Sequence, residues 1–414
     1  MALEEKARQL RLAVPSRESL VRMLKGWERG DHEPSDFYRS LWALVYGVPE
    51  RSLFAELSPS ALSVLGLGLV AVEADSEAGG GSMRRRDVLL SGSVLGSLAF
   101  VGPAQQFRVG MAEAREVAAA ARSLHRWDRQ MGGWVPYQAA IGYVDTAMRL
   151  VRGTYTEKVA HQLLPAVADL CAVTGWVAYD VGQTQEALRY FSLGVQVAQQ
   201  AQDPALAARL LCDMARVNAD LGNPMHSIEL LGLARHLSRS QVTATVLAKL
   251  HSMEAKTYAI LGHSRECQQA IGQASQRIAD GRSERDPGWI GYFNESQFAG
   301  VVGSCYRDLA RVDSRFALKA EDVIQRATTA RSLDQIRNRA LDHVNLATAR
   351  LRRGELDGMA EEATEAVRLA ARLKSDRVNG RLRQLAGEAA AAAKGHQATR
   401  ALLDQVATLA VIGS

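Results

Sequence analysis

Apolar residues recur at helical spacing along most of this chain. Leu20, Leu24 and Trp27 lie at positions i, i+4 and i+7, which predicts one buried stripe on a helix. From Met111 onward, one segment rich in Ala, Leu, Arg and Gln follows another with few prolines between them. These side chains favour helix because they lose little freedom in it. The pattern therefore predicts an all-α protein with almost no strand.

The helix near the start of the chain has clear boundaries in the sequence. Ser16 follows a proline and can cap the helix by accepting a hydrogen bond from a backbone N–H. Gly30 can adopt the left-handed conformation that ends a helix, and Pro34 suits the first turn of the next one. We expect residues 1–56 to form a small helical domain.

Residues 57–110 are expected to be a linker. Residues 78–82 are too rich in glycine to hold a fixed shape. Arg84, Arg85 and Arg86 precede an apolar run and resemble a twin-arginine export signal, but such signals stand at the N-terminus. The apolar run is also shorter than the roughly 20 residues of a membrane-spanning helix. We expect a helix that ties the linker to the next domain, and a cytoplasmic protein without a membrane contact.

Residues 111–414 contain repeats of about forty residues. Gly182, Gly222 and Gly262 are spaced by forty, and Gly354 and Gly395 continue the series. Small residues stand seven positions before and twelve after these glycines: Gly175, Ala215, Ala255, Ala347, Gly194, Ala234, Ala274 and Ala366. Small residues at such positions let paired helices approach closely. The pattern predicts an α-solenoid of helical hairpins.

A further hairpin is expected after a longer loop, residues 280–288, which departs from the period. Its small or aromatic positions are Gly303, Tyr306 and Ala310.

The net charge, the cysteine spacing and the missing enzyme motifs exclude several kinds of function. The chain has a net charge of +5, and its first 54 residues hold nine basic and eight acidic side chains, so bulk charge does not argue for nucleic acid. The four cysteines are far apart and are expected to be buried apolar residues of a reducing cytosol. The sequence lacks H-E-x-x-H, Walker-type and G-x-S-x-G motifs, so we expect no enzyme, no metal site and no cofactor.

The order of several short motifs resembles a known class of regulator. Trp27-Glu28-Arg29-Gly30 is followed by the Arg-rich segment at 84–86, by Asp128 with Gly132-Gly133, and by Gly175-Trp176 with Tyr179-Asp180. This arrangement resembles actinobacterial regulators that join an XRE-type (lambda-repressor-like) helix-turn-helix domain to tetratricopeptide repeats. The resemblance implies a DNA-binding transcriptional regulator, a homodimer, whose repeat body senses a ligand or peptide. The spacing of about forty exceeds the usual thirty-four, so these would be divergent tetratricopeptide repeats.

The front of the DNA-binding domain departs from this pattern. Domains of this class begin with a helix that packs behind the turn, whereas this chain starts where their second helix is expected. Either the natural start lies upstream, or the DNA-binding unit is damaged. An in-frame upstream extension that encodes an amphipathic helix would support the first alternative.

The helix that begins at Ser16 has the composition expected of a DNA-reading element. By position, Arg17 and Arg22 are candidates for base or phosphate contacts, and Ser16, Ser19 and Lys25 for phosphate contacts. The alternative is an ordinary solvated face on a small helical bundle. Since one such domain makes few phosphate contacts, DNA binding would favour a dimer.

The repeat body also has candidate binding residues. In the resembled fold, the first helix of each repeat lines a concave groove, and the corresponding positions here hold Trp176, Tyr179, Arg209, Arg216, Lys249, Lys256, Gln297, Ser304 and Arg307. Clustered arginines and lysines pair with anionic groups, so we expect an acidic small molecule, a peptide carboxylate or a protein partner there. The alternatives are that these cations are merely solvated, and that the chain is an interaction scaffold that does not bind DNA.

Overall fold

The computed structural model describes residues 107–131, 134–238, 242–281 and 283–412. The chain divides between Pro103 and Ala104, and every described residue belongs to the second unit, Ala104–Ser414. The predicted helix-turn-helix, its candidate DNA contacts Ser16, Arg17, Ser19, Arg22 and Lys25, and most of the predicted linker lie outside the described residues. The structure therefore describes the predicted helical body, residues 111–414, apart from its few undescribed residues.

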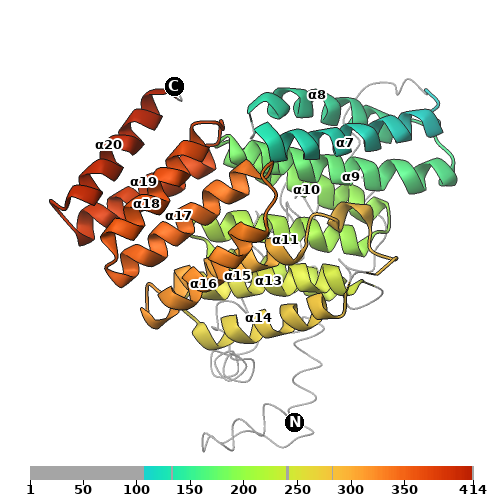
Figure 1. The fold of residues 1–414 in the computed structure, drawn as a ribbon. Coiled ribbons are helices and arrows are strands. Elements are labelled where there is room, and N and C mark those ends of the chain that lie inside the picture. The colour runs from blue at the N-terminus through green and yellow to red at the C-terminus, as the bar shows by residue number, and fades with distance from the viewer. Residues whose placement is uncertain (1–106, 132–133, 239–241, 282, 413–414) are drawn as a thin grey trace, which may run out of the picture. The chain divides into compact units, whose positions relative to one another are not determined.

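The described residues fold into fourteen α-helices and one short 3-10 helix, with no strand among them, as the sequence predicts (Figure 1). The helices are α7 (Met111–Met131), α8 (Trp134–Val151), α9 (Glu157–Asp180), α10 (Thr184–Gln200), α11 (Pro204–Asp220), α12 (Pro224–Leu237), α13 (Ala244–Ile260), α14 (Ser264–Ala279), η2 (Gly288–Ile290), α15 (Glu295–Leu309), α16 (Arg315–Ala330), α17 (Ile336–Arg353), α18 (Leu356–Ala370), α19 (Asp376–Ala392) and α20 (Gln397–Ile412).

Consecutive helices from α9 onward pair into hairpins, and the predicted glycines form their turns. Gly182, Gly222 and Gly262 follow the first helices of three hairpins with φ values of 79°, 83° and 76°. At the first of these turns, the N–H of Gln183 donates to the carbonyl of Ala178 over 2.9 Å. Only glycine adopts this left-handed conformation readily, which explains the spacing of about forty.

The small residues of the repeat lie where helices pack most closely. A Cβ atom on Gly175 of α9 would lie 2.5 Å from the Phe191 ring of α10, and one on Gly303 of α15 would overlap Ile324 of α16. The alanines predicted at equivalent positions in other hairpins are buried: Ala215, Ala255, Ala347, Ala234, Ala274 and Ala366. The predicted hairpin contacts are therefore confirmed.

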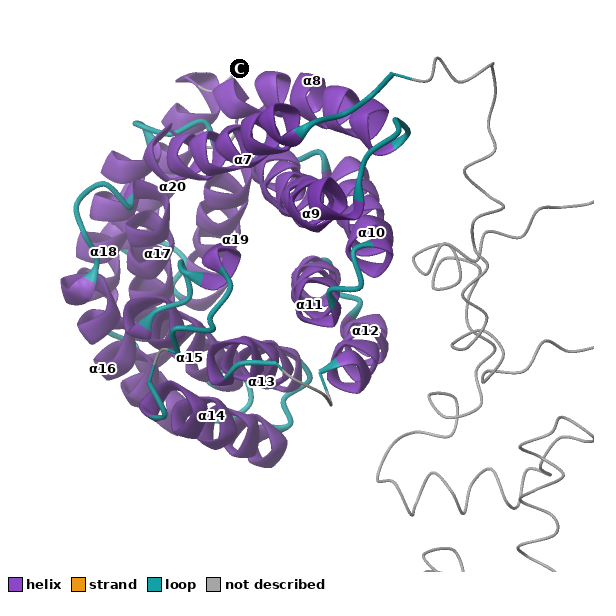
Figure 2. Cartoon of the chain, turned by 90° about the vertical axis from the view of Figure 1, so that its right-hand side faces the viewer, coloured by secondary structure: helices purple, strands orange, loops and turns teal. Residues whose placement is uncertain are grey.

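The hairpins stack side by side into a solenoid that curls into a ring. Viewed end-on, the first helices of the hairpins surround the centre of the ring and the second helices lie outside them (Figure 2). The two ends of the solenoid meet, because α17 contacts α7 and α19 contacts α9. We call this meeting of α7, α9 and α11 with α17 and α19 the ring closure.

Three other features of the body were considered in the sequence: the end of the linker, the most apolar helix and the cysteines. The N–H of Val109 donates to Thr154 O over 2.9 Å, so the last residues of the predicted linker, 107–110, pack on the body. Helix α9 is long and apolar enough to cross a membrane by length and composition, but 67% of its apolar window is buried within the body. All four cysteines are buried and free, as expected: Cys171, Cys212, Cys267 and Cys305.

Candidate anion-binding site

The residues predicted for the concave groove lie on the first helices of four successive hairpins, α9, α11, α13 and α15. These helices line the inner side of the ring (Figure 2). The predicted cations do not face open solvent, however. Each of them contacts an aspartate of the same inner face. The number of aspartates beside each group of cations determines whether that group carries a net positive charge.

The cluster around Arg209 and Lys249 is balanced. Arg209 lies 2.6 Å from Asp169 and 3.4 Å from Asp213, and Lys249 lies 3.1 Å from Asp213. Burial raises the pKa of Asp169, but His125 and Arg209 outweigh it and lower that pKa to about 2. Two cations and two carboxylates balance one another in charge here, so this cluster has no surplus positive charge with which to attract an anion.

The segment between α14 and α15, which includes the loop that interrupts the repeat period, covers this balanced cluster. Trp289 of η2 and Tyr292 each lie 5.6 Å from the Arg209 guanidinium, measured to the ring centre. Aromatic rings at this distance stabilise a cation and exclude water from it. Arg209 is therefore shielded from solvent, and only 2% of its surface is exposed.

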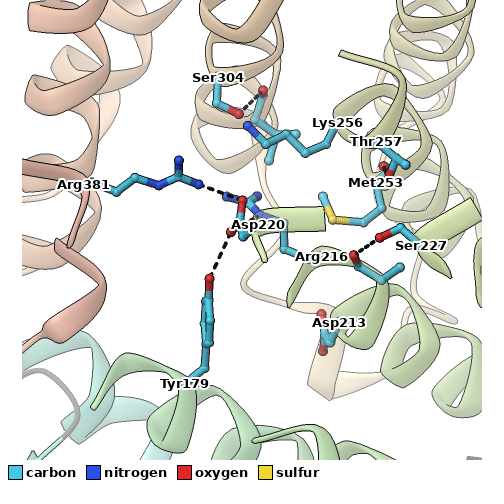
Figure 3. A network of polar contacts seen from close by, with 12 residues as sticks. Tyr179, Asp213, Arg216, Asp220, Ser227, Met253, Lys256, Thr257, Ser304 and Arg381 are labelled. Carbon is cyan, nitrogen blue, oxygen red and sulfur yellow. Dashed lines mark hydrogen bonds and ion pairs between the residues drawn. The ribbon is translucent and has the colours of Figure 1, made fainter. Parts of the chain in front are cut away.

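The centre of the ring closure is Asp220, at the end of α11. Its carboxylate lies 2.9 Å from Arg216 Nε and 2.7 Å from Arg381 Nη2, and it accepts a hydrogen bond from the Tyr179 hydroxyl over 3.4 Å (Figure 3). Burial and Asp220 raise the pKa of Tyr179 to about 12, so its hydroxyl remains a donor. Burial would raise the pKa of Asp220, but the surrounding cations hold it well below its usual range.

A second shared carboxylate lies next to Asp220. Lys256 Nζ is 2.5 Å from Asp308 Oδ2, and Arg307 hydrogen-bonds both to Asp308 and to Asn345. Lys256 is only 1% exposed. Burial, opposed by Asp308 and reinforced by nearby Arg307 and Arg216, lowers the pKa of Lys256 to about 8.

The two uncharged groove candidates on α15 make internal hydrogen bonds. Gln297 Oε1 accepts from Arg331 Nη1 over 3.1 Å, and the Ser304 hydroxyl donates to the Val301 carbonyl over 2.8 Å. Neither group lines the cleft described below, so their role as ligand contacts stays a prediction.

Arg337 of α17 joins the two ends of the solenoid. Its Nη2 atom donates to Asp128 Oδ2 of α7 over 2.7 Å, and Nη1 lies 3.4 Å from Asp180 of α9. Ser375, which caps α19, donates to Asp180 over 2.8 Å. Burial, opposed by Arg337 and reinforced by the neighbouring Asp128, raises the pKa of Asp180. The ring closure is thus largely polar.

Arg377, in the first turn of α19, differs from the other inner cations. Its guanidinium lies 5.6 Å from the Trp176 ring centre and 5.7 Å from that of Tyr179. Within the part of the chain that the structure describes, Arg377 makes no ion pair or hydrogen bond with a carboxylate. Burial and the neighbouring Arg216 lower its pKa from the usual value. Arg377 therefore has N–H donors to offer.

A cleft of about 590 Å³ opens at this point of the ring closure, between α9, α11 and α19. This volume lies within the roughly 300–1,000 Å³ that is usual for small-molecule sites. The cleft is lined by Tyr179, Gly182, Thr184, Asp220, Asp376, Arg377, Gly380, Arg381, Arg383 and Gln384.

The ion pairs around the cleft do not balance. Arg381 and Arg377 add to the cations that share Asp220 and Asp308, and Arg337 with its two aspartates borders the same region. With the two charged residues Asp376 and Arg383 of the cleft lining included, seven cations face five carboxylates, an excess of two positive charges; the cations are Arg216, Lys256, Arg307, Arg337, Arg377, Arg381 and Arg383, and the carboxylates Asp128, Asp180, Asp220, Asp308 and Asp376. Such an excess in a largely buried cluster is costly without an anion.

The repeat pattern predicts one side of this cleft but not the other. The pattern predicts Tyr179, which lines the cleft, and Arg216, which pairs with Asp220 of the lining. Arg377 and Arg381 belong to the last hairpin and reach the cleft because the ring closes. The sequence does place Arg377 and Arg381 four residues apart, and such residues lie on one face of a helix. The aspartates that pair with Arg209 and Arg216 also follow them by four residues.

No protein-family model matches this chain, and no curated protein is significantly similar to it. In the described ranges, no three His, Cys, Asp or Glu side chains form a group that could hold a metal ion.

Proposed function

We propose that this chain is a DNA-binding transcriptional regulator whose helical body binds an anionic ligand. The observation that carries the ligand-binding part is the excess of two positive charges beside a cleft of about 590 Å³ at the ring closure. The balanced cluster around Arg209 shows what a purely structural arrangement looks like in the same molecule.

The DNA-binding part of the proposal comes from the sequence. A capped helix that begins at Ser16, with Arg17 and Arg22 near its start, resembles the reading element of XRE-type domains. The order of motifs along the chain resembles regulators in which such a domain precedes tetratricopeptide repeats. We propose that the chain acts as a homodimer, so that two such elements contact two half-sites.

The ring closure offers a route by which the ligand would alter the body. Its contacts are few and polar, and Arg381 bridges α19 to Asp220 of α11 across the cleft (Figure 3). An anion bound beside Arg381 would compete with Asp220 and so change how tightly the ring closes. A change in curvature would move the DNA-binding domains relative to their half-sites.

Genome-wide selection of DNA fragments by the purified full-length chain tests the DNA-binding part. We expect an enriched site that is lost in an Arg17→Ala/Arg22→Ala variant, and an affinity that falls steeply as salt rises. No enrichment from a folded, dimeric sample would overturn the regulator and favour an interaction scaffold.

A further inference from the structure

We infer that the cleft at the ring closure binds the phosphate group of a small organic molecule, with Arg377, Arg381 and Arg383 as its ligands. This inference rests on the proposed ligand-binding role of the body and names the class of the ligand. All three arginines come from the first turns of α19 and line the same cleft.

Arg377 has the geometry of a pre-positioned anion ligand. The Trp176 and Tyr179 rings hold its guanidinium at 5.6 and 5.7 Å, while no carboxylate among the described residues bonds to its N–H groups. A guanidinium bound at its face by aromatic rings keeps its N–H edge for a planar pair of oxygens. Phosphate oxygens accept such paired N–H bonds well.

The neighbouring residues leave room for the phosphate to approach. A Cβ atom on Gly380 would meet no other atom within 4 Å, so the helix surface beside Arg377 and Arg381 is open to the cleft. Arg383 is exposed, lines the cleft and has no ion pair among the described residues.

The charge excess favours phosphate over a carboxylate. A phosphate monoester carries nearly two negative charges at neutral pH, which matches the excess of two positive charges, whereas a single carboxylate would leave one of them. The volume of about 590 Å³ also exceeds what a phosphate needs. The remaining space, lined on one side by Tyr179, would hold the organic part of the molecule.

Calorimetric titration of the full-length chain with inorganic pyrophosphate tests the inference. We expect binding to the wild type that weakens at least tenfold in Arg377→Gln. Gly380→Leu should weaken it similarly, because the new side chain enters open space without removing a charge. The matched control is Arg326→Gln, which removes an exposed arginine of α16 that pairs with Asp322, and should leave binding unchanged.

Three results would overturn the inference: no pyrophosphate binding by the wild type, equal binding by Arg377→Gln, or tighter binding of citrate than of pyrophosphate, which would assign the cleft to carboxylates. The DNA selection described above is independent of this titration. A chain that selects DNA but does not bind pyrophosphate would refute the phosphate assignment alone, and a chain that binds pyrophosphate but selects no DNA would refute the regulator alone.

Discussion

At the scale of single residues, the inner face of the ring is organised by carboxylates that each serve several cations. Asp220 contacts Arg216, Arg381 and Tyr179, and Asp308 contacts Lys256 and Arg307. Because cations outnumber carboxylates, the loss of a carboxylate and the loss of a cation should have very different consequences.

Asp308→Asn should therefore destabilise the fold more than Lys256→Met does. The first change leaves Lys256 and Arg307 buried without a carboxylate, for which we expect a loss of about 3–5 kcal/mol in the free energy of unfolding. The second leaves Asp308 paired with Arg307 and removes one surplus charge, at a cost of about 1 kcal/mol or less. Urea denaturation of both variants checks this, and equal losses would contradict the surplus of cations.

Lys256 should also make stability depend on pH in the alkaline range. Its pKa is about 8 in the folded chain, below the 10.5 of a free lysine, so the unfolded chain binds more protons between these values. Stability contributed by this residue then rises as pH increases from 8 towards 10. Denaturation at several pH values should show this rise in the wild type relative to Lys256→Met. A difference that falls or stays constant would rule out the lowered pKa.

At the scale of helices, the packing within each hairpin depends on the small residue of the repeat. Gly175 and Phe191 join α9 to α10, and Gly303 and Ile324 join α15 to α16. The turn glycines act separately, since they fix where each first helix ends.

Gly175→Ala should lower the free energy of unfolding by about 1–3 kcal/mol, because the new Cβ atom would overlap the Phe191 ring. Gly232→Ala is the matched control. Gly232 also lies inside a helix, α12, but a Cβ atom there meets open space. This control should raise stability by up to about 1 kcal/mol through helix propensity. Thermal unfolding of both variants compares them, and a Gly175→Ala chain as stable as the wild type would refute the close packing.

The sequence predicts the features that a single hairpin requires, but not those that depend on the whole ring. The repeat, its turns and its small residues were predictable because each is a local requirement of one hairpin. The positions of Arg216 and Lys256 on the inner face followed from the same repeat. Their pairing with Asp220 and Asp308, and the presence of Arg377 beside Trp176, were not predictable, because they depend on the curvature that brings α19 back to α9.

At the scale of the whole body, the ring closure is held by polar contacts that are separate from the hairpin cores. Arg337→Gln leaves Asp128 and Asp180 without their shared cation. We expect the ring to open more often, and amide hydrogen exchange in α7 and α19 to become at least tenfold faster.

Exchange in α14, an outer helix that takes no part in the ring closure, should stay the same in Arg337→Gln. Arg326→Gln, on the outer helix α16, serves as the control variant and should change neither region. Uniformly faster exchange would mean that Arg337 stabilises the fold as a whole, and unchanged exchange in α7 would mean that it does not hold the ring closed.

The most direct test of the account is the affinity of the full-length chain for its selected DNA site, measured with and without pyrophosphate. If anion binding at the ring closure controls DNA binding, the affinity should change about fivefold or more in the wild type, the usual lower range of such coupling. It should not change in Arg377→Gln. An identical affinity with and without pyrophosphate in the wild type, under conditions where the cleft is occupied, would contradict the account.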